Sequence, residues 1–171
     1  MKGSRAFRYL TLPNCQWRPY SSAELEGVLG LKPDGLLVLA SPGNDTQGDR
    51  IVQERRLWDS LGRPPFILRP YAENILSFDP QDWARTCANM VRGYRQAGLG
   101  VWGLVPGNEF NIEGGGEDWE RQTVWLYTFA AEFNRQWPST PLHLPALSPN
   151  GNYRDGWRYY ADHGLGVFYP I

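Results

Sequence analysis

Two short apolar runs constrain the fold of this chain more than any other feature. Residues 36–40 read Leu-Leu-Val-Leu-Ala and residues 101–105 read Val-Trp-Gly-Leu-Val, and Gly or Pro residues lie close to both ends of each run. Runs of this length without polar alternation are typical of strands that are covered on both faces. Such strands occur in parallel sheets packed between helices. The sequence therefore predicts an α/β protein.

Further strand and helix patterns alternate with these two runs. The other predicted strands cover residues 7–12, 66–68, 142–147 and 165–169. Helices are predicted over residues 21–29, 46–61, 80–97, 118–137 and 153–163, from helical spacing of apolar residues and from capping residues at several starts. Alternation at this spacing implies parallel strands joined by crossover helices. A doubly wound open sheet and a (β/α) barrel both fit this order.

The residues that follow the predicted strands favour the barrel. No Gly-rich fingerprint follows the first strand, as a dinucleotide-binding sheet would have. Each strand instead ends in polar or aromatic residues suited to one shared rim. These residues are Asn14, Ser41, Arg69, Tyr71, Asn108, Glu109, Ser148 and Tyr169. We predict one domain over residues 1–171, a TIM-type barrel with about six strands present and its last βα units missing, since a complete barrel needs roughly 200 residues or more.

A polar motif follows the apolar run at residues 101–105. Gly107-Asn108-Glu109-Phe110-Asn111 resembles the Gly-Asn-Glu-Pro-Asn signature that closes the fourth strand in the large clan of retaining (β/α)8 glycoside hydrolases. In that clan the Glu is the general acid/base and the preceding Asn binds the sugar 2-hydroxyl group. The resemblance therefore implies these roles for Glu109 and Asn108. Phe110 departs from the usual Pro.

The resemblance continues in order along most of the chain. Residues 66–71 follow the third-strand spacing of the clan, and residues 145–149 look like its fifth strand. Phe168-Tyr169-Pro170 resembles the sixth-strand His-x-Tyr-Pro, although Val167 occupies the His position. The clan takes its nucleophilic Glu from the seventh strand, and this chain is expected to stop before it. The residues predicted to bind substrate beside the acid/base are Asn108, Arg69, Tyr71, Tyr169 and Asn14.

The function implied by the resemblance is hydrolysis of a β-linked glycoside with retention of configuration. That reaction uses two carboxylates about 5–5.5 Å apart. Two alternatives stay open. One is a barrel that binds carbohydrate, or acts as a scaffold, without catalysis. The other is an unrelated α/β enzyme that uses Glu109 and Arg69 on a phosphorylated or carboxylated substrate, and a structural ion pair is the simplest other role for Arg69.

Composition narrows the partners and excludes several function classes. The net charge of -1 gives no electrostatic case for nucleic acid or acidic membranes, and no stretch is long enough to span a bilayer. No signal peptide is recognisable, so the cytoplasm and secretion with a signal outside this sequence both stay open. Cys15 and Cys87 form no metal motif, and no metal or cofactor is predicted. Trp102 is predicted to lie in the core, whereas a packed and an exposed His143 both stay open, and open strand edges predict self-association.

Overall fold

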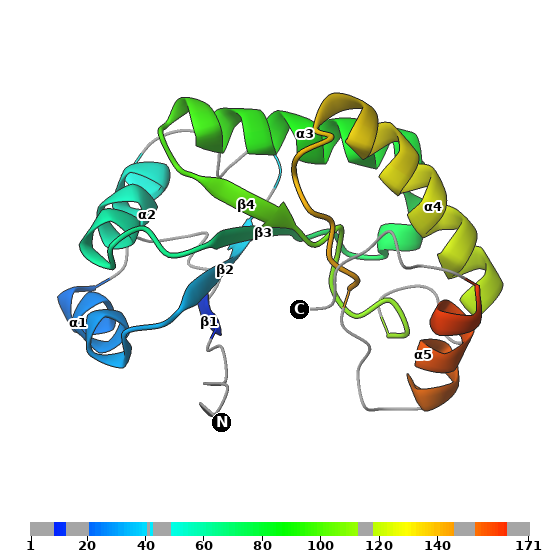
Figure 1. The fold of residues 1–171 in the computed structure, drawn as a ribbon, viewed down its shortest axis with the longest axis horizontal. Coiled ribbons are helices and arrows are strands. Elements are labelled where there is room, and N and C mark those ends of the chain that lie inside the picture. Colours follow the sequence, from blue (N-terminus) through cyan, green and yellow to red (C-terminus); the bar gives the residue numbers. More distant parts are fainter. Residues whose placement is uncertain are drawn as a thin grey trace, which may run out of the picture.

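The computed structural model describes residues 9–12, 21–40, 42, 49–112, 118–145 and 153–163. Strands and helices alternate along them, as the sequence predicts (Figure 1). The elements are β1 (Tyr9–Leu12), α1 (Ser22–Leu31), β2 (Gly35–Ala40), α2 (Asp49–Ser60), β3 (Phe66–Pro70), η1 (Ile75–Ser77), α3 (Pro80–Gln96), β4 (Val101–Leu104), α4 (Trp119–Gln136) and α5 (Tyr153–Asp162). No helix in these described ranges is both long and apolar enough to cross a membrane.

The four strands form one parallel sheet in the order β1-β2-β3-β4. Of the predicted fifth strand at residues 142–147, the structure describes residues 142–145. Leu142 makes a single parallel bridge to Leu104, and Pro145 has no N–H group with which to extend the pairing. The predicted sixth strand at residues 165–169 lies outside the described residues. The described strands form an open sheet and do not close into a barrel, and the predicted self-association through strand edges stays a prediction.

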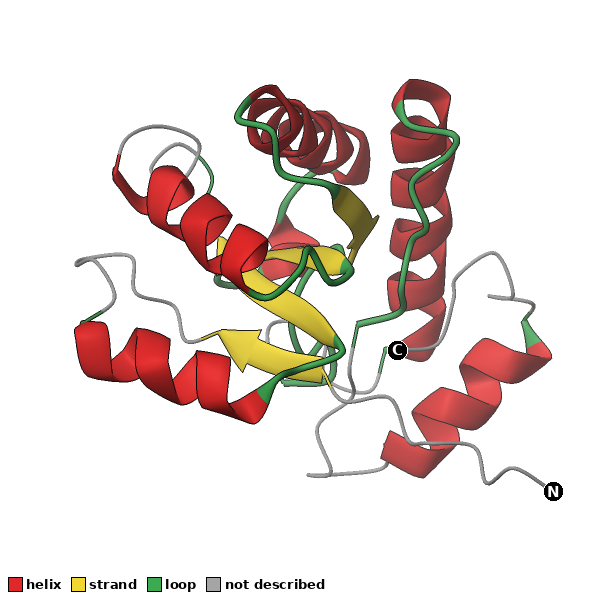
Figure 2. Ribbon diagram, turned by 60° about the vertical axis from the view of Figure 1, so that its left-hand side comes forward, coloured by secondary structure: helices red, strands yellow, loops and turns green. Residues whose placement is uncertain are grey.

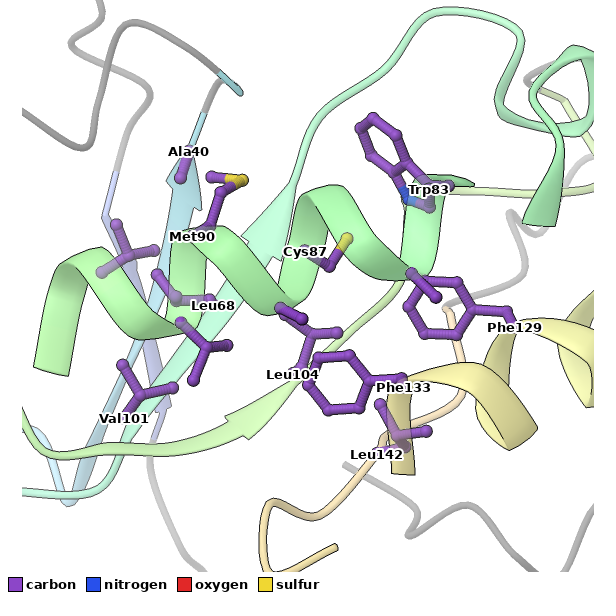
Figure 3. Packing of buried hydrophobic residues seen from close by; sticks show 14 of the residues in the cluster. Ala40, Leu68, Trp83, Cys87, Met90, Val101, Leu104, Phe129, Phe133 and Leu142 are labelled. Atoms are coloured by element: carbon purple, nitrogen blue, oxygen red, sulfur yellow. The ribbon is translucent and has the colours of Figure 1, made fainter. Parts of the chain in front are cut away.

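The main hydrophobic core lies between one face of the sheet and the helices. Alternate strand residues such as Val38, Leu68 and Leu104 pack there against the inward faces of α3 and α4 (Figure 3). Cys87 of α3 is fully buried in this core, and burial raises the pKa of its thiol. Helices α1 to α4 follow one another in an arc around the strands (Figures 1 and 2).

The opposite face of the sheet carries a second, smaller cluster. It consists of Leu37, Ile67 and Val105, one residue from or next to each of three neighbouring strands, and all three are buried. The two clusters arise because successive side chains of a strand point to opposite faces. The prediction that these strands are covered on both faces is therefore confirmed for the centre of the sheet.

The predicted helix starts at Ser21, Pro80 and Asp118 are also confirmed. Ser21 forms a capping box with Glu24: the Ser21 hydroxyl accepts the Glu24 N–H at 3.3 Å, and the Glu24 carboxylate accepts the Ser21 N–H at 2.7 Å. Asp79 caps α3, with Pro80 in the first helical position, and Asp118 caps α4. These caps fix where each crossover helix begins after its strand.

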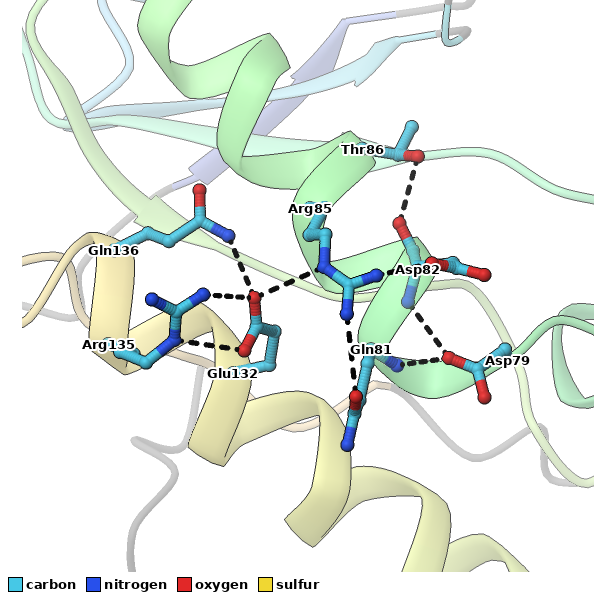
Figure 4. A network of polar contacts seen from close by, with 8 residues as sticks. All are labelled: Asp79, Gln81, Asp82, Arg85, Thr86, Glu132, Arg135 and Gln136. Atoms are coloured by element: carbon cyan, nitrogen blue, oxygen red, sulfur yellow. Dashed lines mark hydrogen bonds and ion pairs between the residues drawn. The ribbon is translucent and has the colours of Figure 1, made fainter.

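A polar network joins the outer surfaces of α3 and α4 (Figure 4). Arg135 and Gln136 donate hydrogen bonds to the Glu132 carboxylate, and Arg85 lies 3.4 Å from it. The hydrogen bond from Arg135 is the largest of the effects that lower the pKa of Glu132 to about 2. Arg85 also donates to Asp82 at 2.5 Å, so the network continues toward the start of α3.

Candidate functional site

Asn108 and Glu109 lie just beyond the carboxyl end of β4. The Val105 N–H group still donates to the Leu68 carbonyl at 2.8 Å, and the chain then leaves the sheet through Pro106 and Gly107. Both polar residues are half-buried, whereas residues 103–107 and Phe110 are buried. Because all four strands are parallel, their carboxyl ends share one edge of the sheet. Asn108 and Glu109 thus stand at that edge and remain accessible to solvent.

The chain before Asn108 is held by a tryptophan of α3. The indole Nε1–H of Trp83 donates a hydrogen bond of 2.7 Å to the Pro106 carbonyl, and this bond is buried. A buried hydrogen bond is costly to break without replacement. Sequence reasoning placed Trp83 on the apolar face of a helix and missed this role, because periodicity identifies a face and not the partner beyond it.

The chain after Glu109 is held by Phe110. Its side chain is fully buried and meets Trp125 of α4 edge to face, with ring centroids 5.4 Å apart. A Cβ atom on Gly107 would lie 2.7 Å from the Phe110 ring and 3.2 Å from Ile75, so only glycine fits here. Phe110 therefore anchors the loop in the core.

Glu109 itself makes a tight turn. Its carbonyl accepts the Ile112 N–H at 2.9 Å, which folds the chain back directly after the motif. Among the residues that the structure describes, no ion pair joins the Glu109 carboxylate to Arg69, and the roles predicted for Arg69 stay predictions. A half-buried carboxylate between two anchors is suited to act on a bound solute.

Two further predicted residues lie at the end of the neighbouring strand. Arg69 is half-buried near the end of β3, and Tyr71 directly follows that strand with 40% of its surface exposed. The Tyr71 N–H donates to the Ala40 carbonyl at 2.8 Å, so the strand pairing extends to this residue. The structure thus brings Arg69, Tyr71, Asn108 and Glu109 to adjacent strand ends. The other predicted rim residues, Asn14, Ser41, Ser148 and Tyr169, lie outside the described residues.

Trp102 is not in the core, contrary to the prediction. Phe66 pairs with Val101 and Ile67 with Gly103, so Trp102 is an extra residue in a β-bulge and is 45% exposed. His143 is buried, and its ring centroid lies 5.4 Å from that of Trp102. A Cβ atom on Gly103 would lie 2.6 Å from the imidazole, so this glycine makes room for His143.

Two hollows formed by described residues lie away from Glu109. Two cavities of about 470 and 490 Å³ open between α3 and α4, and the residues that line them include Val124 and Tyr127 but not Glu109. In the same ranges, no group of three or more His, Cys, Asp or Glu side chains is placed to hold a metal ion.

Comparisons with protein-family models, with curated proteins and with solved structures found no match to this chain. The resemblance to the glycoside hydrolase clan therefore rests on the motif at residues 107–111 and on the order of the strands and helices.

Proposed function

We propose that this chain is the larger part of a barrel-type glycoside hydrolase, with Glu109 as general acid/base and Asn108 as the residue that orients the sugar. The observation that supports this most directly is the position of Asn108 and Glu109 at the carboxyl end of β4. In (β/α) barrels the carboxyl ends of the strands carry the active site. The proposal thus rests on the location of Glu109 at the strand ends and on the ability of its carboxyl group to donate and accept a proton.

The strand order supports a barrel over a doubly wound sheet. In a doubly wound sheet the order reverses at a switch point, whereas barrel strands follow one another consecutively. Here the order is β1-β2-β3-β4, and Leu142 continues it on the far side of β4. The small cluster of Leu37, Ile67 and Val105 lies on the face that a closed barrel would enclose. We propose that residues 1–171 supply about six strands of such a barrel.

The proposed reaction follows from the two-carboxylate mechanism. Glu109 protonates the glycosidic oxygen as the bond to the leaving group breaks, and a second carboxylate attacks the anomeric carbon. Glu109 then removes a proton from the water that hydrolyses the glycosyl-enzyme. The second carboxylate is proposed to come from a seventh strand, about 5–5.5 Å from Glu109. Arg69 and Tyr71, together with Asn14 and Tyr169, are proposed to bind sugar hydroxyl groups.

Substitution of Glu109 in the complete gene product tests this proposal. Glu109→Gln is expected to lower kcat for glycosides with poor leaving groups by about 10²- to 10⁴-fold, the usual contribution of a general acid. Activated aryl glycosides need little protonation, so the first step of their hydrolysis is expected to be nearly unaffected. For Glu109→Ala, azide is expected to restore turnover and to yield a glycosyl azide, because this anion attacks without help from a base.

Glu26→Gln is the matched control, because it removes an exposed carboxylate from α1 and is expected to leave both substrate classes unaffected. Equal activity of Glu109→Gln and the original protein on poor substrates would refute the acid/base role. If calorimetry detects oligosaccharide binding and no substrate is turned over, the protein is a carbohydrate-binding barrel instead.

A further inference from the structure

Trp83 and Phe110, which hold the chain on either side of Glu109, belong to one continuous series of contacts. Phe78 and Trp83 pack with ring centroids 5.2 Å apart, across the cap residue Asp79 of α3. These positions, one before the cap and four after it, form a hydrophobic staple. The staple fixes the direction of the Trp83 ring, which in turn donates its N–H to the Pro106 carbonyl. The start of α3 is thereby tied to the chain just before Asn108.

Phe78 is also connected, through Trp125, to Phe110. The indole Nε1–H of Trp125 donates to the Phe78 carbonyl at 2.9 Å, and the Trp125 ring packs edge to face against Phe110. The contacts therefore run from Pro106 through Trp83, Phe78 and Trp125 to Phe110. We call these five residues the aromatic bracket. It begins and ends on the two sides of the Gly107-Asn108-Glu109 segment.

We infer that the aromatic bracket positions Glu109 for proton transfer, with Trp83 and Trp125 as positioning residues. Trp83 of α3 contacts the loop after β4 through its indole hydrogen bond to Pro106, and Trp125 of α4 contacts it through its ring packing on Phe110. The second contact of each tryptophan is with Phe78. Both rings are buried, with 5% of each side chain exposed, so neither is placed to touch a substrate. The catalytic part of this inference rests on the proposed function, whereas the ordering of the loop does not.

Trp83→Phe tests the inference, because it keeps a ring in the staple and removes only the indole N–H. The matched control is Trp58→Phe, which removes the same kind of bond, of 2.7 Å, to the Pro64 carbonyl before β3. The first measurement is the NMR order parameter of the Gly107, Asn108 and Glu109 amides. We expect values near 0.85 in the original protein and in Trp58→Phe, and values below about 0.6 in Trp83→Phe.

The second measurement compares substrates. In Trp83→Phe we expect kcat to fall roughly 10- to 100-fold for poor leaving groups, since a small misplacement of a catalytic group has effects of that size. The first step with activated aryl glycosides, measured as the rate of the initial burst of aryl leaving group, is expected to change less than about threefold, because that step depends little on protonation. A general loss of structure would lower both substrate classes alike, and Trp58→Phe is expected to lower neither.

Order parameters of residues 107–109 that are unchanged in Trp83→Phe would overturn the inference. If this variant does not fold, Trp125→Phe loosens the same segment from the side of Phe110 and decides the question by the same measurement. Loosened amides with no discrimination between substrates would refute the role in proton transfer. Full activity of Glu109→Gln on poor substrates would refute the proposed function but not the ordering of the loop by the aromatic bracket. The order parameters decide that ordering independently.

Discussion

The two ends of the sheet are built in different ways. At the amino ends of β3 and β4, the preceding helices stop in short connections at residues 61–65 and 97–100. Each stop is a Schellman motif: Gly62 and Arg63 donate to the Asp59 and Trp58 carbonyls, and Gly98 and Leu99 donate to the Arg95 and Tyr94 carbonyls. Both glycines have positive φ, 78° and 83°. At the amino ends of these strands, backbone hydrogen bonds and glycines with positive φ therefore terminate the preceding helices.

At the carboxyl ends, the connections are longer and aromatic side chains hold them. Residues 71–79 follow β3 and residues 105–118 follow β4. Trp83 and Phe110 hold the described part of the β4 connection, while Asn108 and Glu109 between them stay half-buried. This difference indicates that backbone caps are sufficient at the end of the sheet that contributes only to stability. The end of the sheet that exposes polar side chains is instead ordered by buried aromatic rings that contact its connections.

Phe110→Ala is expected to have the largest effect and to act on both stability and function. Removal of a fully buried phenylalanine ring typically costs about 3–5 kcal/mol. Phe133→Ala is the matched control, because Phe133 is equally buried but lies toward the end of α4. Urea titration is expected to give similar losses for both variants. Under conditions where both are folded, only Phe110→Ala is expected to lower kcat for poor leaving groups, and equal turnover would contradict the special role of the carboxyl end.

Gly98→Ala is expected to act on stability alone. A positive φ costs a residue with a Cβ about 1–2 kcal/mol, and here the new atom would also displace the Arg55 guanidinium. That guanidinium donates to the Ala97 carbonyl at 2.7 Å, a bond whose loss adds about 1 kcal/mol or more. Gly62→Ala shares the strain of positive φ but meets nothing within 4 Å.

The two glycine variants can be compared directly by urea unfolding, and the difference between them measures the Arg55 contact. We expect Gly98→Ala to be the less stable by about 1 kcal/mol. Both are expected to retain the turnover of the original protein per folded molecule. Lower kcat in either variant would show that the amino end of the sheet also affects the site.

The order of the elements could be predicted because it depends on local signals. The apolar runs at residues 36–40 and 101–105, the cap residues Ser21, Asp79 and Asp118, and the stop glycines act within a few residues of the chain. The position of Glu109 at a strand end followed from the same signals. These features therefore appear in the structure close to where the sequence places them.

Features that depend on distant partners could not be predicted. The bulge that exposes Trp102 arises from how β4 pairs with β3, not from the composition of β4. The bond from Trp83 to Pro106 spans 23 residues, and that from Trp125 to Phe78 spans 47. Only Phe78 and Trp83 carry a local signal, since they flank the cap Asp79 at staple spacing. Sequence pattern thus located the candidate acid/base but not the contacts that hold it.

The smallest effect is expected from Glu132, whose network lies on the outer helix surface and belongs to neither end of the sheet. Hydrogen bonds and charge from Arg135 lower its pKa from 4.5 to about 2. Because the folded-state pKa is the lower one, the carboxylate stabilises the fold above about pH 4.5, and this contribution is lost as the pH falls toward about 2. Glu132→Gln is expected to reduce the dependence of the urea midpoint on pH in that range, with turnover at neutral pH unchanged.

Glu26→Gln, which removes an exposed carboxylate from α1, is expected to keep the pH dependence. Identical profiles for Glu132→Gln and the original protein would mean that the network does not stabilise the packing of α3 on α4.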